Sequence, residues 1–254
     1  MVQLSGHSRS KLDRIRYHWL SKSPNENFDY TQYRYLIYDG TYFHKDGCFI
    51  SLMSPENNKT IAHTYAPKEG FKSTYSWFES LKDKGLNPLC ITMDGEQFVM
   101  KAIRLVWPFT KIQRCLYHIL RQGLSWLRTF PKTQAGAELR ALLMRITAIK
   151  SFKDRDLFFD LYRNWYLTYR DAIKKLPNTT VAFKDLKKTM ALIHHALPDL
   201  FHYLNDSNIP STTNLLESFH SRLKADYRRH RGLTNTNKIN YLSWYCFFNN
   251  SNIS

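Results

Sequence analysis

Three carboxylates in this chain could do chemistry together. Asp39 and Asp94 each close a short apolar run and are followed by glycine, within the stretches 37–40 (Ile-Tyr-Asp-Gly) and 92–95 (Thr-Met-Asp-Gly). Runs of this length predict buried strands, and the glycine predicts the turn out of the sheet. An aspartate at that junction lies at the carboxyl edge of the sheet, where open α/β sheets bind ligands. Glu217 is the candidate for a third carboxylate in the set.

Carboxylates on three separate elements suit divalent-metal chemistry on phosphates. Such a set can hold two Mg²⁺ ions about 3.5–4 Å apart, which serve the attacking and the leaving oxygen of an in-line displacement. Mg²⁺ accepts one or two carboxylates together with substrate phosphate oxygens. We therefore predict that Asp39, Asp94 and Glu217 are catalytic residues and ligands of Mg²⁺, with Mn²⁺ as a substitute.

Each of these residues also has a structural interpretation. The two Asp-Gly pairs are typical turn dipeptides, and Asn214 with Glu217 fits the spacing of a capping box at the start of a helix. Helical spacing places Glu217 on a different face from Leu216 and Phe219. That polar face combines a carboxylate, a hydroxyl and two cations, from Glu217, Ser221, Lys224 and Arg228. Both interpretations stay open at this point.

The charge of the chain indicates a polyanionic partner. Its 254 residues carry a formal net charge of +16, with a pI near 9.7. An excess of this size opposes compaction and usually serves binding, with nucleic acid as the first expectation and an acidic membrane as the second. No apolar run reaches the roughly 18 residues that cross a bilayer, and residues 1–9 lack the apolar centre of a signal peptide. Nucleic acid is therefore favoured over a membrane.

The cysteine pattern fits an intracellular protein. Cys48, Cys90, Cys115 and Cys246 are widely spaced, and the sequence contains no Cys-x-x-Cys pair. This spacing does not support an all-cysteine zinc site, and it suits a reducing compartment. We expect a cytoplasmic, nucleoid-associated protein without structural disulfides.

The elements that must position the carboxylates fall into a first, strand-rich half. Strand patterns end in short turns, with Asp46-Gly47 as a predicted bulge or turn, and a helix closed by Gly85 then crosses to a strand parallel to the first. The predicted strands are 33–39, 43–53, 59–65, 90–94 and 111–114, and the predicted helices are 71–84 and 96–107. This order predicts a mixed sheet with flanking helices.

The pattern changes after residue 115. Strand signals give way to helical periodicity, interrupted by prolines, over 119–130, 136–150, 153–176 and 183–204. A final helix, 214–227, carries Glu217, and 241–248 is an apolar helix or strand. We predict an α/β fold with an all-helical insertion before the last helix, and domains at 1–27, 28–115, 116–206 and 207–254.

The N-terminal stretch has two interpretations. Residues 1–27 are polar and basic, and Leu12, Ile15 and Trp19 follow at helical spacing. This pattern is that of the end of a helix-turn-helix, which would make 1–27 the remnant of a DNA-binding region. It is equally that of an ordinary amphipathic helix with a solvated basic face.

Taken in order, these motifs resemble the DDE transposases with an RNase H-like catalytic domain, and within them the Mutator-like group and its bacterial insertion-sequence relatives. The resemblance covers about residues 33–245. The motifs that carry it are Tyr-Asp-Gly-Thr-Tyr at 38–42, Met-Asp-Gly at 93–95, Cys-Leu-Tyr-His at 115–118, Thr-Asn-Leu-Leu-Glu-Ser-Phe-His-Ser-Arg-Leu-Lys at 213–224 and Arg-Gly-Leu at 231–233.

The resemblance implies Mg²⁺-dependent cleavage at transposon ends and transfer of the 3′-OH into target DNA, by a homodimer or larger assembly. Its triad maps to Asp39, Asp94 and Glu217, and its Cys-or-Asp, two residues, His signature maps to Cys115 and His118. Members of the family carry an N-terminal DNA-recognition domain, of which this sequence has at most the end. The DNA-contacting residues expected are Cys115, His118, Ser221, Arg222, Lys224, Arg228, Arg229 and Arg231.

Several roles stay open. His118 either contacts DNA or orients a catalytic group while Cys115 packs, or both residues only support the sheet edge; one Cys and one His make half of a tetrahedral zinc site, so no zinc is predicted. For the whole chain, two alternatives stand beside the transposase. One is a non-catalytic DNA-binding remnant of the same origin. The other is an RNase H-like nuclease or resolvase, which would hydrolyse DNA without joining ends.

Overall fold

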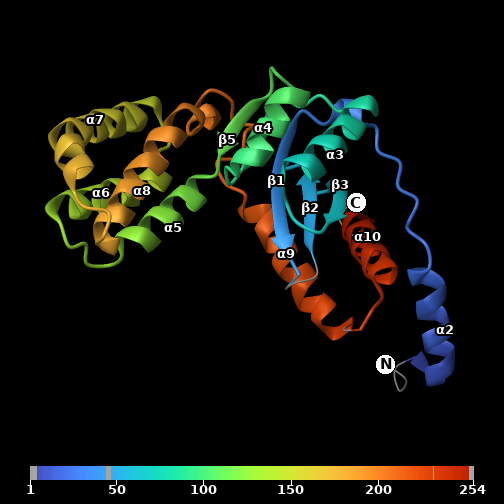
Figure 1. Cartoon of the computed structure of the whole chain (residues 1–254). Coiled ribbons are helices and arrows are strands. Elements are labelled where there is room, and N and C mark those ends of the chain that lie inside the picture. The colour runs from blue at the N-terminus through green and yellow to red at the C-terminus, as the bar shows by residue number, and fades with distance from the viewer. Residues whose placement is uncertain (1–4, 44–46, 231, 252–254) are drawn as a thin grey trace. The chain divides into compact units, whose positions relative to one another are not determined.

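The computed structural model describes residues 5–43, 47–230 and 232–251, and the described part is a mixed α/β protein (Figure 1). Its strands form one five-stranded sheet in the order β3-β2-β1-β4-β5. Their bounds are β1 Tyr35–Tyr42, β2 Cys48–Met53, β3 Thr60–Ala66, β4 Cys90–Met93 and β5 Lys111–Arg114. The order confirms the predicted mixed sheet, and the helices after β5 confirm the predicted helical insertion before the helix that carries Glu217.

Strand direction follows the lengths of the connections. β2 and β3 are joined by a short turn and pair antiparallel, from Cys48↔Ala66 onwards. β1, β4 and β5 are parallel neighbours, with Ile37 opposite Thr92 as the last registered pair of β1 and β4. Parallel strands need long crossovers, and the helices after β3 and β4 supply them. The prediction about Asp46-Gly47 concerns Asp46, which lies outside the described residues.

Most helices lie within a few residues of the predicted bounds, but the predicted helix 183–204 ends at Ala196, where short 3-10 turns follow. Asn214–Tyr227 matches the predicted final helix, and the apolar stretch near the C-terminus belongs to a helix rather than a strand. The bounds are α2 Arg9–Leu20, α3 Phe71–Asp83, α4 Gln97–Val106, α5 Leu116–Leu127, α6 Gln134–Arg145, α7 Phe152–Lys175, α8 Val181–Ala196, α9 Asn214–Tyr227 and α10 Asn235–Ser251. Within the described ranges, no helix is both long and apolar enough to cross a membrane.

Contacts divide the chain into two compact units. Unit 1 contains residues 1–33, 38–87 and 214–254, and unit 2 contains residues 34–37 and 88–213. The division passes through β1, whose first residues pair with β4 in unit 2. The predicted domain boundaries remain predictions.

In unit 1, helices cover both faces of its strands. Neighbouring residues of a strand point to opposite faces. The ring of Tyr38 contacts Phe78 of α3, with centroids 5.8 Å apart. Asp39, the next residue, contacts His220 of α9. Helix α10 packs beside α9 at β3, where Nε2 of His63 lies 3.0 Å from the Ser243 hydroxyl (Figure 1).

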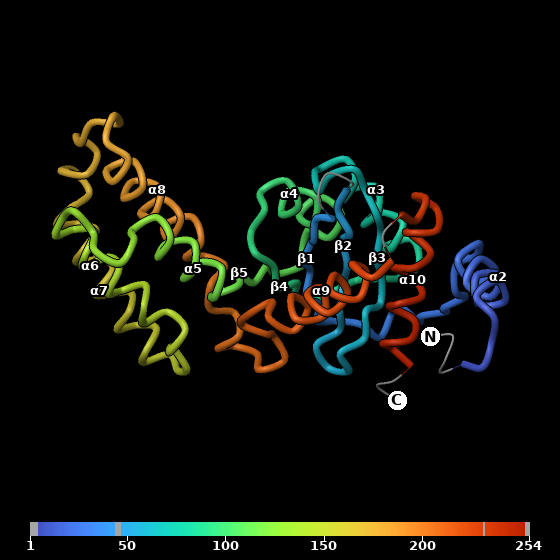
Figure 2. Tube along the Cα trace, turned by 90° about the horizontal axis from the view of Figure 1, so that it is seen from below, coloured from blue at the N-terminus to red at the C-terminus, as the bar shows by residue number. Residues whose placement is uncertain are grey.

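The N-terminal helix α2 is attached to α10 (Figure 2). Nε1 of Trp244 donates to the carbonyl oxygens of Trp19 and Lys22, each at 2.9 Å. The two tryptophan rings meet edge-on, with centroids 4.9 Å apart. The side-chain amide of Asn240 donates to the carbonyl of Leu20 at 2.7 Å. The apolar side of α2 thus packs against α10. The helix-turn-helix interpretation stays a prediction.

Unit 2 contains an apolar core of its own, formed by α5 to α8. Leu139, Leu143 and Ile193 are fully buried within it. Gly123 allows α5 to approach α6 closely, because a Cβ there would lie 2.5 Å from a methyl carbon of Leu143. Trp165 is buried, and its Nε1 donates to the carbonyl of Ala135 at 2.9 Å.

The core of unit 2 gives a direct stability test. Leu143→Ala removes a fully buried side chain and should lower the free energy of unfolding by about 2–5 kcal/mol. Met144→Ala is the matched control, because Met144 follows on the same helix but is 59% exposed; its cost should stay within about 0.5 kcal/mol. Urea unfolding followed by circular dichroism measures both. Equal costs for the two variants would contradict this assignment of the core.

Candidate functional site

Asp39 lies inside β1 rather than at its end. The strand continues to Tyr42, so the prediction that Gly40 turns the chain out of the sheet is wrong. Pairing with β4 ends earlier, at Ile37, and β2 borders β1 on its other side. The side chain of Asp39 is 15% exposed, and its Oδ2 lies 2.9 Å from Nδ1 of His220. The carboxylate is therefore accessible and held on one oxygen.

At Gly40 the chain does not turn, and instead the side chain of Glu69 approaches the backbone closely. A Cβ at this position would lie 2.8 Å from a carboxylate oxygen of Glu69. The other oxygen of Glu69 accepts a hydrogen bond from the Tyr38 hydroxyl at 2.6 Å. A second acidic side chain therefore packs on the backbone next to Asp39, and it would have to shift if residue 40 carried a Cβ.

Asp94 does lie at the end of its strand. β4 ends at Met93, and Gly95 has φ +100°, so the predicted turn is confirmed. One oxygen of Asp94 accepts from the backbone N–H of Glu96 at 3.1 Å. Nε of the buried Arg114 donates to the Asp94 carbonyl at 3.2 Å. Burial lowers the pKa of Arg114, and the charge of Asp94 opposes that shift.

The strand register relates the two aspartates along the sequence. Ile37 and Thr92 form the last registered pair of β1 and β4. Asp39 follows Ile37 by two residues, and Asp94 follows Thr92 by two. Each aspartate therefore follows the last registered pair by the same number of residues along its own segment.

Glu217 lies in the first turn of α9 and is half-buried. The predicted apolar face is confirmed, because Leu216, Phe219 and Leu223 are fully buried. His220 is buried with them, at 3% exposure. Sequence reasoning gave His220 no role, although a histidine among buried apolar positions, three residues after a candidate ligand, was a usable signal. Residues three apart share a helix face, so Glu217 stands one turn from the contact with Asp39.

Cys115 and His118 form a small polar cluster within unit 2. The backbone N–H and the hydroxyl of Thr213 each lie 3.4 Å from the Cys115 sulfur. The Thr213 hydroxyl also lies 3.4 Å from Nδ1 of His118. Cys115 is fully buried, so it packs and does not present its thiol to DNA, which corrects its inclusion among DNA contacts. His118 is half-buried and keeps both predicted roles.

The predicted DNA-contacting residues of α9 lie mostly on its surface. Lys224 is half-buried, with its ammonium 5.9 Å from the centre of the Phe43 ring. The exposed members are Ser221, Arg222, Arg228 and Arg229. Arg229 forms an exposed ion pair with Asp226 at 3.8 Å, which contributes little to stability. Arg231 lies outside the described residues. The end of α9 thus presents a cationic strip.

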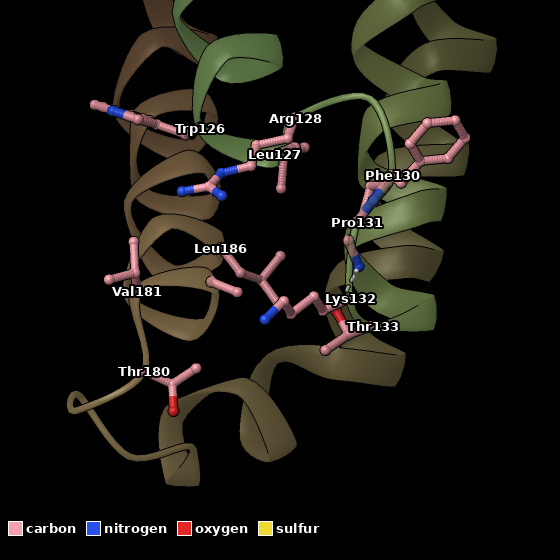
Figure 3. A pocket seen from close by; sticks show the side chains of 12 residues that line it. Trp126, Leu127, Arg128, Phe130, Pro131, Lys132, Thr133, Thr180, Val181 and Leu186 are labelled. Atoms are coloured by element: carbon pink, nitrogen blue, oxygen red, sulfur yellow. Dashed lines mark hydrogen bonds between the residues drawn. The ribbon is translucent and has the colours of Figure 1, made fainter.

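Unit 2 also contains a cavity of about 290 Å³ where α5 ends and α8 begins (Figure 3). The side chains of Arg128 and Lys132 extend toward it, and Leu186 lies on its floor (Figure 3). Trp126 lines it as well, with the Lys188 ammonium 5.5 Å from the ring centre. The cavity is a second concave surface with cations, and it lies in the predicted helical insertion.

The fold and these residues define a mixed α/β protein with acidic groups on β1, at the end of β4 and on α9, and with exposed cations on and just after α9. Comparison with protein families matches residues 53–242 to the family described as "Transposase, Mutator family". The match covers most of the chain, and the protein belongs to this family.

Curated relatives agree with the family. The chain is 21% identical over 231 residues to the transposase for insertion sequence element IS1201 of Lactobacillus helveticus. It is 24% identical over 212 residues to the transposase for insertion sequence element IS905 of Lactococcus lactis subsp. lactis (strain IL1403). These alignments cover 88% and 78% of this chain, but 57% and 49% of the relatives. The chain thus spans about half the length of the relatives it matches.

The thiol of Cys115 gives a pH-dependent test. Burial alone would raise its pKa, but hydrogen bonds with His118 and Thr213 outweigh burial and lower the pKa below the ordinary value. Burial raises the pKa of Cys48 and of Cys90 to about 12, and that of Cys246 as well. Titration of thiolate ultraviolet absorbance should therefore show one step below the ordinary thiol pKa of about 8.5.

Two variants assign that step. Cys115→Ala should abolish it, and Thr213→Val should move it to higher pH, because the hydroxyl hydrogen bond is lost. A thiol whose pKa is lowered by folding adds stability above its unfolded pKa, and this stability is lost as the pH falls through the folded pKa. A step that survives in Cys115→Ala would contradict the assignment.

Proposed function

We propose that this chain is the catalytic part of a DDE transposase, which cleaves DNA at transposon ends and joins the 3′-OH to target DNA. Asp39, Asp94 and Glu217 supply the catalytic carboxylates. Membership of the Mutator family supports the class of reaction. We propose further that it acts within the cell, in keeping with its free cysteines, and that it works as a dimer or larger assembly, since two transposon ends are processed together.

One observation carries the proposal. The helix that bears Glu217 also holds the carboxylate of Asp39, through the 2.9 Å contact of His220. An ordinary turn aspartate would not be oriented by a buried side chain from a helix 181 residues away. A capping role for Glu217 explains its place in the first turn of α9, but it does not explain why the next turn reaches Asp39. Metal-binding carboxylates account for both features.

The donor set fits Mg²⁺ or Mn²⁺. Hard divalent cations prefer carboxylate oxygens, and the three proposed ligands are carboxylates on separate elements. The protein orients one oxygen of each aspartate, through His220 and through the Glu96 N–H. Because each carboxylate has a second oxygen, both residues can serve a metal while staying oriented. When bound, the metal would activate the attacking oxygen and stabilise the leaving oxygen at the phosphate.

The chain's own residues would bind and align the DNA. The exposed cations are Arg222 on α9, which also carries Glu217, and Arg228 and Arg229 directly after the helix. Cations there would hold phosphates next to the acidic residues and offset the repulsion between carboxylates and DNA. A net charge of +16 supports attraction of DNA beyond these contacts.

The carboxylates give the first test of the proposal. Asp39→Asn, Asp94→Asn and Glu217→Gln should each reduce Mn²⁺-dependent nicking of supercoiled plasmid, and joining of a 3′-OH oligonucleotide to it, by at least about 10³-fold, since each removes a charged metal ligand. Binding of duplex DNA should persist. Gel assays of nicking and joining, together with fluorescence anisotropy for binding, measure these effects.

Exposed acidic residues supply the controls. Asp83→Asn on α3 and Asp160→Asn on α7 remove the same charge from the surface, and both variants should keep wild-type activity. Metal-independent DNA binding without nicking in the wild-type chain would instead favour a non-catalytic remnant. Nicking without joining would favour a nuclease.

The cationic strip gives a second test. Removing two phosphate-contacting cations with Arg222→Ala and Arg228→Ala should reduce the slope of log affinity against log salt by about 1.8 for duplex DNA. The control removes two other exposed cations, Lys72 on α3 and Lys84 just after it, with Lys72→Ala and Lys84→Ala, at the same net charge. Equal slopes for the two double variants would show that α9 does not contact phosphates. Anisotropy titrations over a range of salt concentrations measure the slopes.

A further inference from the structure

A buried hydrogen-bond chain lies behind Asp39. Nδ1 of His220 is 2.9 Å from Oδ2 of Asp39, and Nε2 of the same ring is 2.7 Å from the Ser51 hydroxyl. His220 is 3% exposed, and Ser51 on β2 is fully buried. The ring of Phe49 meets the His220 ring edge-on, with centroids 5.8 Å apart. Both ring nitrogens therefore have partners, and packing fixes the plane of the ring.

The chemistry of the partners decides which atom donates in these hydrogen bonds. An ionised carboxylate only accepts hydrogen bonds, so the proton must be on Nδ1 of His220, facing Asp39. In a neutral imidazole the other nitrogen, Nε2, is then an acceptor. The Ser51 hydroxyl can donate to it, so the tautomer set by Asp39 leaves both ring nitrogens with a partner. The opposite tautomer would place the Nδ1 lone pair against a carboxylate oxygen.

We propose that His220 is a positioning residue for Asp39, and that Ser51 holds the His220 ring in place through a second hydrogen bond. The proposal rests on the function proposed above, in which Asp39 is a metal ligand. By holding one oxygen of Asp39, His220 orients the second oxygen toward the divalent cation. Partners of this kind, which orient a metal ligand, typically change metal affinity or activity by about 10–100-fold when they are removed.

Because His220 lies on α9, its contact with Asp39 also bears on the position of Glu217. His220 and Glu217 are three residues apart and belong to the same stretch of helix. The helix that supplies one proposed ligand therefore orients another, so a shift of α9 would disturb both at once. A leucine at position 220 would fill the apolar face equally well. The histidine leaves two polar atoms to be satisfied in the core, a cost that is repaid only if both hydrogen bonds form.

Mn²⁺ binding by the full chain tests the positioning role without an activity readout. Free Mn²⁺ is measured by electron paramagnetic resonance, at a pH well above the ordinary histidine pKa of about 6.5. We expect His220→Leu to weaken Mn²⁺ binding by about 10–100-fold. His220→Asn should restore most of the affinity, because its amide can donate from near the position of Nδ1. Ser51→Ala should weaken binding by a smaller factor.

A second buried histidine–serine pair provides the matched control. His63 of β3 contacts Ser243 of α10 at 3.0 Å in the same unit, and Ser243 is not an acidic residue. His63→Leu should leave Mn²⁺ affinity within about 2-fold of wild type, even if it lowers stability. Equal weakening by His220→Leu and His220→Asn would overturn the proposal, since the hydrogen-bond donor would then not matter. Unchanged binding in His220→Leu would overturn it too.

The tautomer provides a metal-free readout. ¹⁵N-histidine NMR of the metal-free chain should show His220 protonated at Nδ1, and Asp39→Ala should disturb that state because it removes the acceptor. Protonation at Nε2 in the wild type would overturn the inference, whether or not metal binds. If the wild type binds no Mn²⁺ while His220 is protonated at Nδ1, the proposed metal site fails and the hydrogen-bond chain stands as structure only. Failure of the metal site and failure of the positioning role are thus distinguishable. If His220→Leu does not fold, Ser51→Ala and His220→Asn still test the proposal.

Discussion

The buried contact of His220 with Asp39 and Ser51 fixes how α9 sits on the strands of unit 1. Apolar packing of Leu216 and Phe219 is non-directional, so it would tolerate small slides of the helix along the sheet. Hydrogen bonds at 2.7 and 2.9 Å do not tolerate them, because a buried group that loses its partner costs about 1–3 kcal/mol. The helix is therefore held in register by polar atoms, within a face that is otherwise apolar.

Polar contacts also join the two ends of the segment between β5 and α9. The N–H of Leu116, at the start of α5, donates to the carbonyl of Ser211 at 3.0 Å. Thr213, which directly precedes α9, lies 3.4 Å from the sulfur of Cys115. The helices in between bury their apolar faces against one another. A long insertion with tied ends costs little more in loop-closure entropy than a short one, which explains how the fold accommodates it.

The excess of positive charge is distributed in two ways. Most cations are exposed and available to a polyanion, as on α9. A few are buried and serve the fold. Lys238 of α10 is 2% exposed, and its ammonium lies among the rings of Phe43, Tyr65 and Tyr227, 4.6–5.9 Å from their centres. Aromatic faces attract a cation in this way, and the high aromatic content of 15% therefore stabilises charge as well as the core.

The sequence by itself determined the element types, their order, the apolar face of α9 and the candidate carboxylates, because hydrophobic periodicity and turn residues are local signals. It also determined the family, since the ordered motifs are read along the chain. Only the tertiary structure decided that Asp39 lies within its strand, that Gly40 makes room for Glu69, and that His220 holds Asp39. These depend on atoms from segments 31 to 181 residues apart. Which polar groups meet in a core is set by packing, which no local pattern records.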